Sequence, residues 1–577
     1  MKIETAKSGF RPKRQLGKRA ASLVLAIMLC CCYGCERGRH IQDSLGVNGF
    51  ESAKTYAEVS SKLKGIVQKQ RAQKWIDSIL RRRFYWGQTL MLDSAVEMES
   101  VMPMASGLGG MSATNNQTAG IDEMDIMKSN GESLFIIANG VICAYSLNDG
   151  APALEAVLGA GLPNPKGLFL HGNTLVCFFS GYDRGKAASI VHCYNISNPK
   201  EPILARQLKL EGRLETARML GSKVYTATKA AFSGDWDHVP MYSDNGEQWR
   251  KVAAANIALA PDPSSENYIV ASAFDVVDLS QKASVIAAFG CGETIYCAHE
   301  ALYAIGLSGR RSVSTLIARF EFGGPGFGHA SLGSVDGVYN NTFSFGEHNS
   351  FLRVALERDR MPLISILDDR LNIVSEVELE AARRENIKSV RFMGDIGYVV
   401  TFLNTDPLFV VDLSDPYCPM VLGELEVPGF SSYLHPIGNK SLLGIGTAVW
   451  NTYKLSLFSV SNPYNPIEIT TLELAENLMP DIIGDHRVGA FLSSANLFFS
   501  PSTDLGEYSQ SIEAYTVTAG SLEHIASIEN GPAQHGINRA LASNGILYAI
   551  NAKSISCYDI RGFAHISDTV LAPPTER

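Results

Sequence analysis

The chain has 577 residues, of which 46% are hydrophobic and only 19% are charged. This composition, with 51 glycines, is typical of a folded, strand-rich protein and excludes a disordered chain. The net charge of −9 is unevenly distributed: residues 1–34 carry seven Lys/Arg and one acid, whereas the rest holds 43 basic and 58 acidic residues. An acidic body argues against nucleic-acid binding, which needs a basic face.

Residues 1–35 have the pattern of a secretory signal. Seven basic residues precede the apolar run 20–32, which is shorter than the about 20 residues of a membrane span. The small residue Gly34 before Cys35 is similar to a bacterial lipoprotein cleavage site, although Cys32 stands where Leu is usual. We expect lipid attachment at Cys35 and an extracytoplasmic protein anchored in the cell membrane; a plain secreted protein or an uncleaved anchor is the alternative.

Residues 36–93 are expected to form a tether and then a basic amphipathic helix. Apolar residues recur at helical spacing from about residue 52 to 83, between nine Lys/Arg and two acids. Such a helix can lie on anionic lipid headgroups or pack its apolar stripe on the main domain, and we favour the second. Residues 94–119 have no periodicity and are predicted to be a linker.

Seven cysteines lie beyond the signal, so at least one is unpaired or bonded to another molecule. Cys177 and Cys193 are equidistant from residue 185, the middle of an expected hairpin loop, and are candidates for a cross-strand bridge. Buried free thiols are the commoner alternative. Beyond Cys32 and Cys35 the sequence has no CxxC pair, so zinc is not indicated.

Three segments, residues 196–202, 413–419 and 460–466, repeat a Ser-Asn/Asp-Pro-x-x-Pro pattern. Each follows a short apolar run and precedes another. Asn198, Asp415 and Asn462 can bend the chain by accepting from the backbone N–H two residues on, and the prolines remove donors where strand pairing must stop. The repeat therefore predicts a turn between two strands and not a peptide-recognition motif.

Weaker copies of the segment extend the repeat at intervals of 43 to 57 residues, with longer gaps of 83 residues before Leu279 and 134 after it. Units of this size, made of about four strands, are typical of propeller blades. We therefore predict an all-β fold, a β-propeller over residues 120–565 with about eight blades (seven is the alternative, if the first and last segments share a blade). The polar stretch 233–266 is an expected loop insertion, and residues 566–577 form a tail.

Several runs resemble a family of bacterial and archaeal secreted proteins with a C-terminal β-propeller domain, distantly similar to WD-repeat and methanol-dehydrogenase-type propellers. The resemblance rests on residues 114–117, 120–126, 389–395, 406–416, 428–436 and 444–446. It implies the propeller fold and the location outside the cytoplasm, and it carries no established biochemical activity.

The family-like runs supply the candidate ligand- or metal-binding residues. Asp122, Glu123 and Asp125 form an acidic cluster that either binds Ca²⁺ or caps the first blade turn, and the second is favoured because the spacing lacks a known calcium loop. His435, Arg391 and Asp406 either line the funnel of the propeller or hold turns.

No catalytic residues are assigned, because the sequence has no HExxH, GxSxG, Walker A or GxGxxG motif. The sequence favours a non-catalytic binding or scaffold module for an envelope protein, peptide or glycan, without a cofactor and without nucleic acid. The alternative is an envelope hydrolase or oxidoreductase that uses His435 and the acidic cluster in the funnel.

Overall fold

The computed structural model describes residues 49–81, 111–112, 114–309, 313–324, 326–402, 406–448, 452–533 and 537–571, without the side chains of residues 75–81 and 406. The signal and Cys35 lie outside the described residues. Among the helices that the structure describes, none is long and apolar enough to cross a membrane.

The first elements are β1 (Glu51–Ser52) and the 26-residue helix α2 (Tyr56–Arg81). Val59, Leu63 and Val67 of α2 are fully buried in a cluster with the second and third sheets of the main domain. Because the apolar stripe is used in this contact, the helix packs on the domain, as favoured above.

Nine sheets follow, and we name them blades 1 to 9 in chain order. Blade 1 contains β3 (Met127–Ser129), β4 (Ser133–Ala138), β5 (Val141–Ser146) and β6 (Ala153–Leu158). Blade 2 contains β7 (Pro165–His171), β8 (Thr174–Asp183), β9 (Lys186–Asn195) and β10 (Ile203–Glu211). Blade 3 contains β11 (Arg213–Leu220), β12 (Lys223–Ala231), β16 (Asn267–Asp275) and β17 (Ser284–Phe289).

Blades 4 to 6 are regular antiparallel four-stranded sheets. Blade 4 contains β18 (Thr294–Cys297), β19 (Ala301–Ser308), β20 (Ser314–Gly323) and β21 (Gly326–Asp336). Blade 5 contains β22 (Phe345–His348), β23 (Phe351–Arg358), β24 (Met361–Leu367) and β25 (Ile373–Glu378). Blade 6 contains β26 (Asn386–Met393), β27 (Ile396–Phe402), β28 (Asp406–Asp412) and β29 (Met420–Val427).

Blades 7 to 9 complete the series. Blade 7 contains β30 (Phe430–Ile437), β31 (Ser441–Thr447), β32 (Tyr453–Ser459) and β33 (Ile467–Glu473). Blade 8 contains β34 (Leu478–Pro480), β35 (Ala490–Leu492), β36 (Leu497–Asp504), β37 (Ser509–Val517) and β38 (Leu522–Pro532). Blade 9 contains β39 (Asn538–Ser543), β40 (Ile546–Asn551), β41 (Ser554–Asp559) and β42 (His565–Val570).

Short 3₁₀ helices connect the strands. They are η1 (Asn148–Gly150), η2 (Ala254–Asn256), η3 (Thr342–Ser344), η4 (Glu380–Ala382), η5 (Asp481–Ile483), η6 (His486–Val488) and η7 (Ser493–Ala495).

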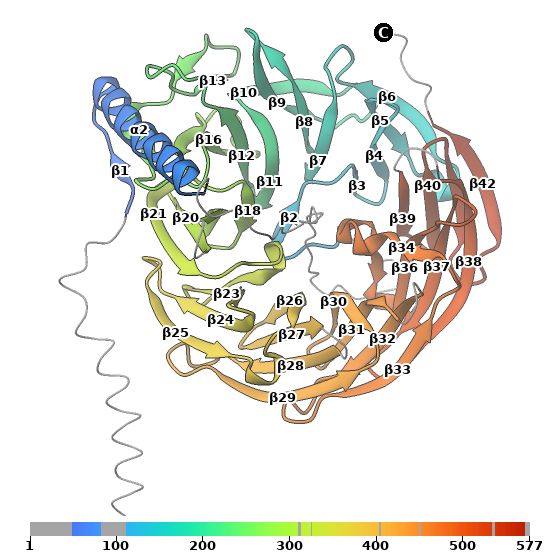
Figure 1. The fold of residues 1–577 in the computed structure, drawn as a ribbon. Helices are drawn as coiled ribbons and strands as arrows, with labels where there is room; N and C mark the ends of the chain where they lie inside the picture. The colour runs from blue at the N-terminus through green and yellow to red at the C-terminus, as the bar shows by residue number, and fades with distance from the viewer. Residues whose placement is uncertain are drawn as a thin grey trace, which may run out of the picture. The chain divides into compact units, whose positions relative to one another are not determined.

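The blades form a closed ring around a central axis (Figure 1). Each of nine hydrophobic clusters in the described residues joins two consecutive blades, and one of them joins blade 1 to blade 9. A single blade cannot bury both of its faces, so stacking around the ring supplies the core. The predicted all-β propeller with a preceding helix is confirmed.

The described residues form nine sheets, close to the prediction of about eight blades that the repeat spacing gave. The interval of 134 residues between Leu279 and Leu413 holds blades 4 and 5 complete. The spacing of the repeat copies therefore agrees with the series of blades once these two blades are included. Blades 1 and 9 are separate sheets, and the ring does not close by sharing one blade between the two ends.

The repeated Asn/Asp-Pro segment is the turn before the fourth strand of a blade. The side-chain oxygen Oδ1 of Asp415 accepts from the backbone N–H of Tyr417 at 2.9 Å, and Asn462 accepts from Tyr464 at 3.2 Å. Asn198 accepts from Lys200 in the same way. The predicted turn chemistry is therefore confirmed at all three copies.

The turns also join neighbouring blades. The hydroxyl of Ser375, on the outer strand of blade 5, donates to the carbonyl of Pro416 in the turn of blade 6 at 2.6 Å. The hydroxyl of Thr569 on β42 donates to the carbonyl of Pro152 in the corresponding turn of blade 1 at 2.9 Å, across the closure of the ring. Each of these turns therefore bonds to the outer strand of the preceding blade, and we call this contact the latch.

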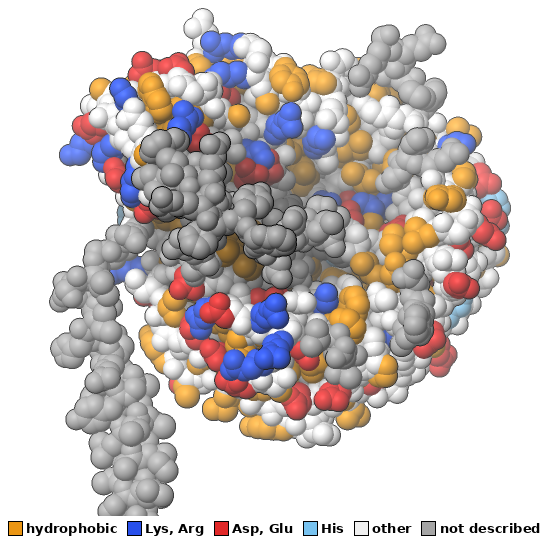
Figure 2. Space-filling view, in the orientation of Figure 1, with side chains coloured by type: hydrophobic (Ala, Val, Ile, Leu, Met, Phe, Trp, Pro, Cys, Tyr) orange, Lys and Arg blue, Asp and Glu red, His pale blue; other side chains and the backbone are white. Residues whose placement is uncertain are grey.

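The outermost strands carry exposed apolar side chains along the edge of the ring (Figure 2). Examples are Met420, Ile467 and Val570. An outermost strand has a sheet neighbour on one side only, so its other side faces solvent.

The stretch 233–266 extends two blades. Its strands β13 (Met241–Asp244) and β14 (Arg250–Lys251) add to the outer side of blade 2, and β15 (Ile257–Leu259) lies between β17 and β1. The stretch also receives helix α2, because Lys69 pairs with Asp262 at 2.8 Å and Arg71 pairs with Glu266 at 2.8 Å. It is a bridge between the helix and the ring, and not a free loop.

Cys177 and Cys193 do not face each other. The register of β8 and β9 pairs Cys177 with His192 and Val176 with Cys193, because Asp183 pairs with Lys186 and the hairpin centre lies half a residue before position 185. The bridge between Cys177 and Cys193, considered above beside buried free thiols, is therefore not formed, since a shift of one residue puts the two thiols on opposite faces of the sheet. The described cysteines are all free.

The latch between blades 6 and 7 can be tested by adding a side chain at Gly423 on β29. A Cβ atom there would lie 2.7 Å from the carbonyl oxygen of Pro463 in the turn of blade 7, and that backbone cannot rotate away. We expect Gly423→Ala to lower the free energy of unfolding by about 1–3 kcal/mol, as measured by denaturant unfolding. Gly520→Ala is the matched control, because a Cβ there meets no atom within 4 Å. Equal stability of the two variants would contradict the latch.

Candidate functional site

Residues 111–112 and 114–126 run through the centre of the ring, and we call them the axial segment. Its strand β2 (Ile121–Glu123) pairs with β11 of blade 3. Met111 forms an isolated bridge with Ser543 of blade 9, and Asp125 forms one with Leu168 of blade 2. The segment therefore adds to the inner edge of three blades, and Figure 1 shows β2 near the axis.

Side chains join the axial segment to further blades. The amide nitrogen of Asn115 donates to the Tyr433 hydroxyl at 3.1 Å and to the His486 carbonyl at 2.9 Å. The amide nitrogen of Gln117 donates to the Thr342 carbonyl at 2.9 Å. Asn115 and Gln117, which lie in the stretch expected to be a linker, thus bond to the blades around them.

The three acidic residues point to different partners. Asp122 pairs with Lys128 at 2.7 Å. Asp125 accepts from its neighbouring backbone N–H and lies 3.5 Å from Arg539. Glu123 accepts from the backbone N–H of Gln117 at 2.6 Å and lies 3.2 Å from Nε2 of His486.

This arrangement does not gather the carboxylates around one point. Among the residues that the structure describes, no group of three His, Cys, Asp or Glu side chains is placed to hold a metal ion. The geometry fits the structural alternative, in which the acidic cluster attaches the start of the first blade to the ring.

Glu123 and His486 form a buried pair, each 3% exposed at the side chain. Burial raises the pKa of Glu123 to about 8, although the N–H of Gln117 and the charge of Arg487 act to lower it. Burial holds the pKa of His486 well below its usual value, and the charge of Asp485 only partly opposes this. Both shifts favour the neutral forms, so the pair holds the axial segment through a hydrogen bond between a carboxyl and an imidazole.

Three cavities adjoin the axial segment. The largest, of about 870 Å³, is lined by residues 117–119 and by the inner turns of blades 4 to 8; we call it the central cavity. A second, of about 330 Å³, is lined by Asp122, Asp125 and Lys128 among others. A third, of about 270 Å³, is lined by Glu123, Arg218 and His486 among others.

The predicted site residues are divided between these cavities. His435 and Arg391 line the central cavity, which is the first of the two alternatives given for them above. The acidic residues line the other two. Asp406 begins β28, and its side chain lies outside the described residues. His435 and the acidic cluster therefore do not share a cavity.

Aromatic rings form much of the wall of the central cavity. His435 stacks on Phe491 with ring centroids 3.5 Å apart and an angle of 5° between the planes. Nδ1 of His435 lies 3.1 Å from the Tyr433 hydroxyl. Burial, and then the charge of Arg391, hold the pKa of His435 well below its usual value, so the imidazole is neutral at pH 7.

Two buried arginines lie in the same wall. Arg391 is 2% exposed, lies 5.7 Å from the centre of the Phe343 ring and donates to the carbonyl of Gln117 at 3.3 Å. Arg353 is 5% exposed and lies 4.8 Å from the centre of the Phe392 ring. Desolvation by burial lowers the pKa of each to about 10, so both stay charged at pH 7.

The sequence did not single out His486, Glu347 or Arg353. Arg353 sits inside a strand among apolar residues, and His486 lies in a short 3₁₀ helix. The one local signal that could have identified Arg353 is its position as a lone charged residue in an apolar strand, since such a residue is buried only with partners.

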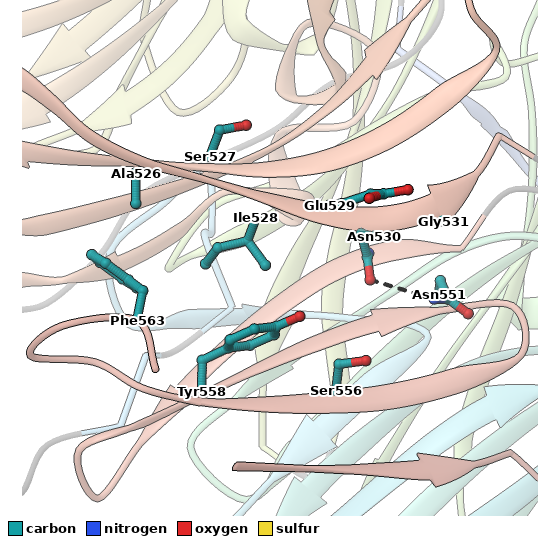
Figure 3. A pocket seen from close by; sticks show the side chains of 10 residues that line it. All are labelled: Ala526, Ser527, Ile528, Glu529, Asn530, Gly531, Asn551, Ser556, Tyr558 and Phe563. Atoms are coloured by element: carbon teal, nitrogen blue, oxygen red, sulfur yellow. Dashed lines mark hydrogen bonds between the residues drawn. The ribbon is translucent and has the colours of Figure 1, made fainter. Parts of the chain in front are cut away.

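A fourth hollow, of about 410 Å³, lies away from the axis, between β38 of blade 8 and β41 of blade 9 (Figure 3). Ile528, Tyr558 and Phe563 give it an apolar side, and Asn530 and Asn551 give it a polar side. Asn530 donates to the carbonyl of Ile550 at 3.1 Å, which holds blades 8 and 9 together. None of the residues predicted from the sequence lines this hollow.

The Glu123–His486 pair predicts a pH dependence of stability. The folded-state pKa of Glu123, about 8, lies above the ordinary value of 4.5, so its contribution is full below pH 4.5 and is lost as the pH rises through 8. His486 is present in both proteins, so its own protonation contributes equally to the two pH dependences. We expect the wild-type protein to lose about 1–2 kcal/mol more than Glu123→Gln over this interval, measured by denaturant unfolding.

The control for this series is Glu132→Gln, because Glu132 is an exposed acid on the first blade. It should keep the wild-type slope. A Glu123→Gln slope equal to that of the wild type would show that no proton is bound at this site in the folded protein.

A family model described as "Beta propeller domain" matches residues 111–563. A protein of Archaeoglobus fulgidus described as uncharacterized is 35% identical over 242 residues, which is 42% of this chain and 36% of that protein. An uncharacterized protein of Methanocaldococcus jannaschii is 37% identical over 235 residues, covering 39% of this chain and 36% of that one. The matched region therefore spans about a third of either relative.

Among solved structures, the WD40 domain of SCAP from fission yeast aligns with 78% of this chain and 97% of its own. The sequence identity is 10% and the TM-score is 0.31.

Proposed function

Because the chain belongs to the beta propeller domain family, whose matched region begins at the axial segment, we propose that it is a binding module with its ligand site in the central cavity. The observation that carries the proposal is the cavity itself. Its volume of about 870 Å³ lies within the range of small-ligand sites, and its wall combines aromatic rings with a few fixed polar groups.

The framework around the cavity favours a pre-formed site. Its lining comes from strands and short turns of five blades, such as the β30–β31 turn with Gly438 at φ 63°. These turns are held by strands whose cores join blade to blade, so binding does not require the wall to be assembled first. A glycine suits this left-handed position because it has no Cβ.

The alternative of a hydrolase or oxidoreductase needs His435 to act with the acidic cluster. Since these residues line different cavities, a binding role accounts for the geometry with fewer assumptions. We propose an envelope protein, a peptide or a glycan as the partner.

We also propose that the protein works outside the cytoplasm, held to the cell membrane by a lipid on Cys35. The support is the basic and apolar pattern of residues 1–35. Lys69 and Arg71 of α2 pair with acids of the ring, which leaves lipid attachment as the simpler route to the membrane.

Partner capture tests the binding site. Ala519 is exposed at the edge of the central cavity, and Ala519→Trp should obstruct the entrance without disturbing the core. We expect in-cell cross-linking of the full chain, followed by mass spectrometry, to yield at least ten times less of the bound species from this variant than from the wild type. Ala475→Trp, at an exposed position outside the cavity, should capture the wild-type amount. Undiminished capture by Ala519→Trp would refute the site.

Incorporation of labelled palmitate tests the anchor. The wild-type protein should carry the label and sediment with membranes, and Cys35→Ser should lose both properties because it has no thiol to acylate. Cys32→Ser is the matched control and should stay labelled. A wild-type protein without label would refute lipid attachment.

A further inference from the structure

From the charges and surfaces of the central cavity we infer that its ligand is an apolar carboxylate, a flat hydrophobic group that bears a carboxylate, such as the aromatic C-terminal residue of a peptide. This inference rests on the proposed binding function and narrows it to one chemical class. Four features of the wall lead to it.

The first feature is the set of hydrogen bonds that Arg353 makes. Its Nε donates to the carbonyl of Gly346 at 3.1 Å, and its Nη1 donates to the carbonyl of Gly394 in the next blade. A guanidinium group has five N–H donors, so these bonds orient the group and leave three donors over. Within the described residues Arg353 forms no ion pair, and the acid that acts on it from nearby, Asp395, is bonded to His348 at 3.1 Å.

The second feature is the second guanidinium in the same wall. Arg391 and Arg353 come from neighbouring blades, and each lies against a phenylalanine ring of the cavity. Two buried positive charges are costly, and an anion between or beside them lowers that cost. A planar guanidinium matches a carboxylate through two parallel hydrogen bonds, which a single ammonium group cannot form.

The third feature concerns Glu347, the acid that lines the cavity and opposes an anion. One of its carboxylate oxygens accepts from the hydroxyl of Tyr303, and the other accepts from the backbone N–H of Glu300 at 3.1 Å. Burial raises the pKa of Glu347, although the Tyr303 hydrogen bond acts to lower it. The carboxylate is thus directed to the wall behind it, and the balance of charge facing the cavity is positive.

The fourth feature is the chemistry of the remaining surface. Phe343, Phe345, Phe392 and Phe491 line the cavity, and Phe491 forms a flat stack with His435. Phenylalanine rings accept an aromatic or aliphatic group, whereas the hydroxyl groups of a sugar would find partners only at the polar lining residues, such as Asn439, Ser493 and Asn496. The wall therefore favours an apolar acid over an acidic sugar.

Calorimetric titration of the wild-type full chain tests the inference with three probes. N-acetyl-L-phenylalanine has the carboxylate and the ring, its amide has the ring alone, and glucuronate has the carboxylate on a sugar. We expect the acid to bind at least tenfold more tightly than both other probes, because a hydrogen bond to a charged group is lost with the amide. This comparison needs no variant and does not depend on the folding of one.

Two variants then locate the carboxylate. Arg353→Met should weaken binding of N-acetyl-L-phenylalanine by about tenfold or more and leave the amide unchanged. Arg370→Met, at an exposed position outside the cavity, should bind the acid as the wild type does. Equal binding of acid and amide, tighter binding of glucuronate, or no binding of any probe would overturn the inference.

The failure of this inference can be separated from that of the proposed function. If partner capture is lost in Ala519→Trp while acid and amide bind alike, the cavity is a binding site for a ligand of another class. If capture persists in Ala519→Trp, the cavity is not the site, and the proposed function and the inference both fail.

Discussion

The buried contact between Glu123 and His486 fixes the axial segment inside a ring of nine blades, and the remaining features of the centre depend on it. A ring with more blades encloses a wider axis, which must be filled or hydrated. Here the axial segment fills it, with backbone pairing to blades 2, 3 and 9 and side-chain bonds to others. The segment thereby divides the axis into separate cavities.

This division separates two kinds of site that the sequence had placed together. The acidic residues of the segment are used in fastening it, whereas the aromatic rings and arginines of blades 5 to 8 face the largest cavity. Charges in the first group have partners close by, and Arg353 in the second keeps donors to spare. The structural carboxylates therefore differ from the groups available to a ligand mainly in having bonding partners within the protein, and less in residue type.

Local chemistry made the blades predictable from sequence. Asp415 and Asn462 determine their turns through bonds to backbone groups two residues away, so their role is readable in a short window. Contacts across the ring are not readable in this way. Asn115 bonds to a residue 371 positions later, and the axial segment has no periodicity of its own, so it resembled a linker. Similarly, the register that separates Cys177 from Cys193 depends on one residue in a hairpin. His435 and Arg391 were found through family-like runs, whereas Arg353 and His486 carried no such signal.

The central claim is that the axial segment is an integral part of the folded ring and forms one wall of the ligand cavity. Hydrogen–deuterium exchange of the full chain tests it most directly, because residues 121–123 pair with β11 in the centre, and the N–H groups of Ile121 and Glu123 donate to Thr118 and Asn116 of the same segment. The account predicts that these amides exchange as slowly as those of β11 itself. Exchange as fast as that of the exposed turn at Ala519 and Gly520 would contradict it, since the centre of the ring would then be open.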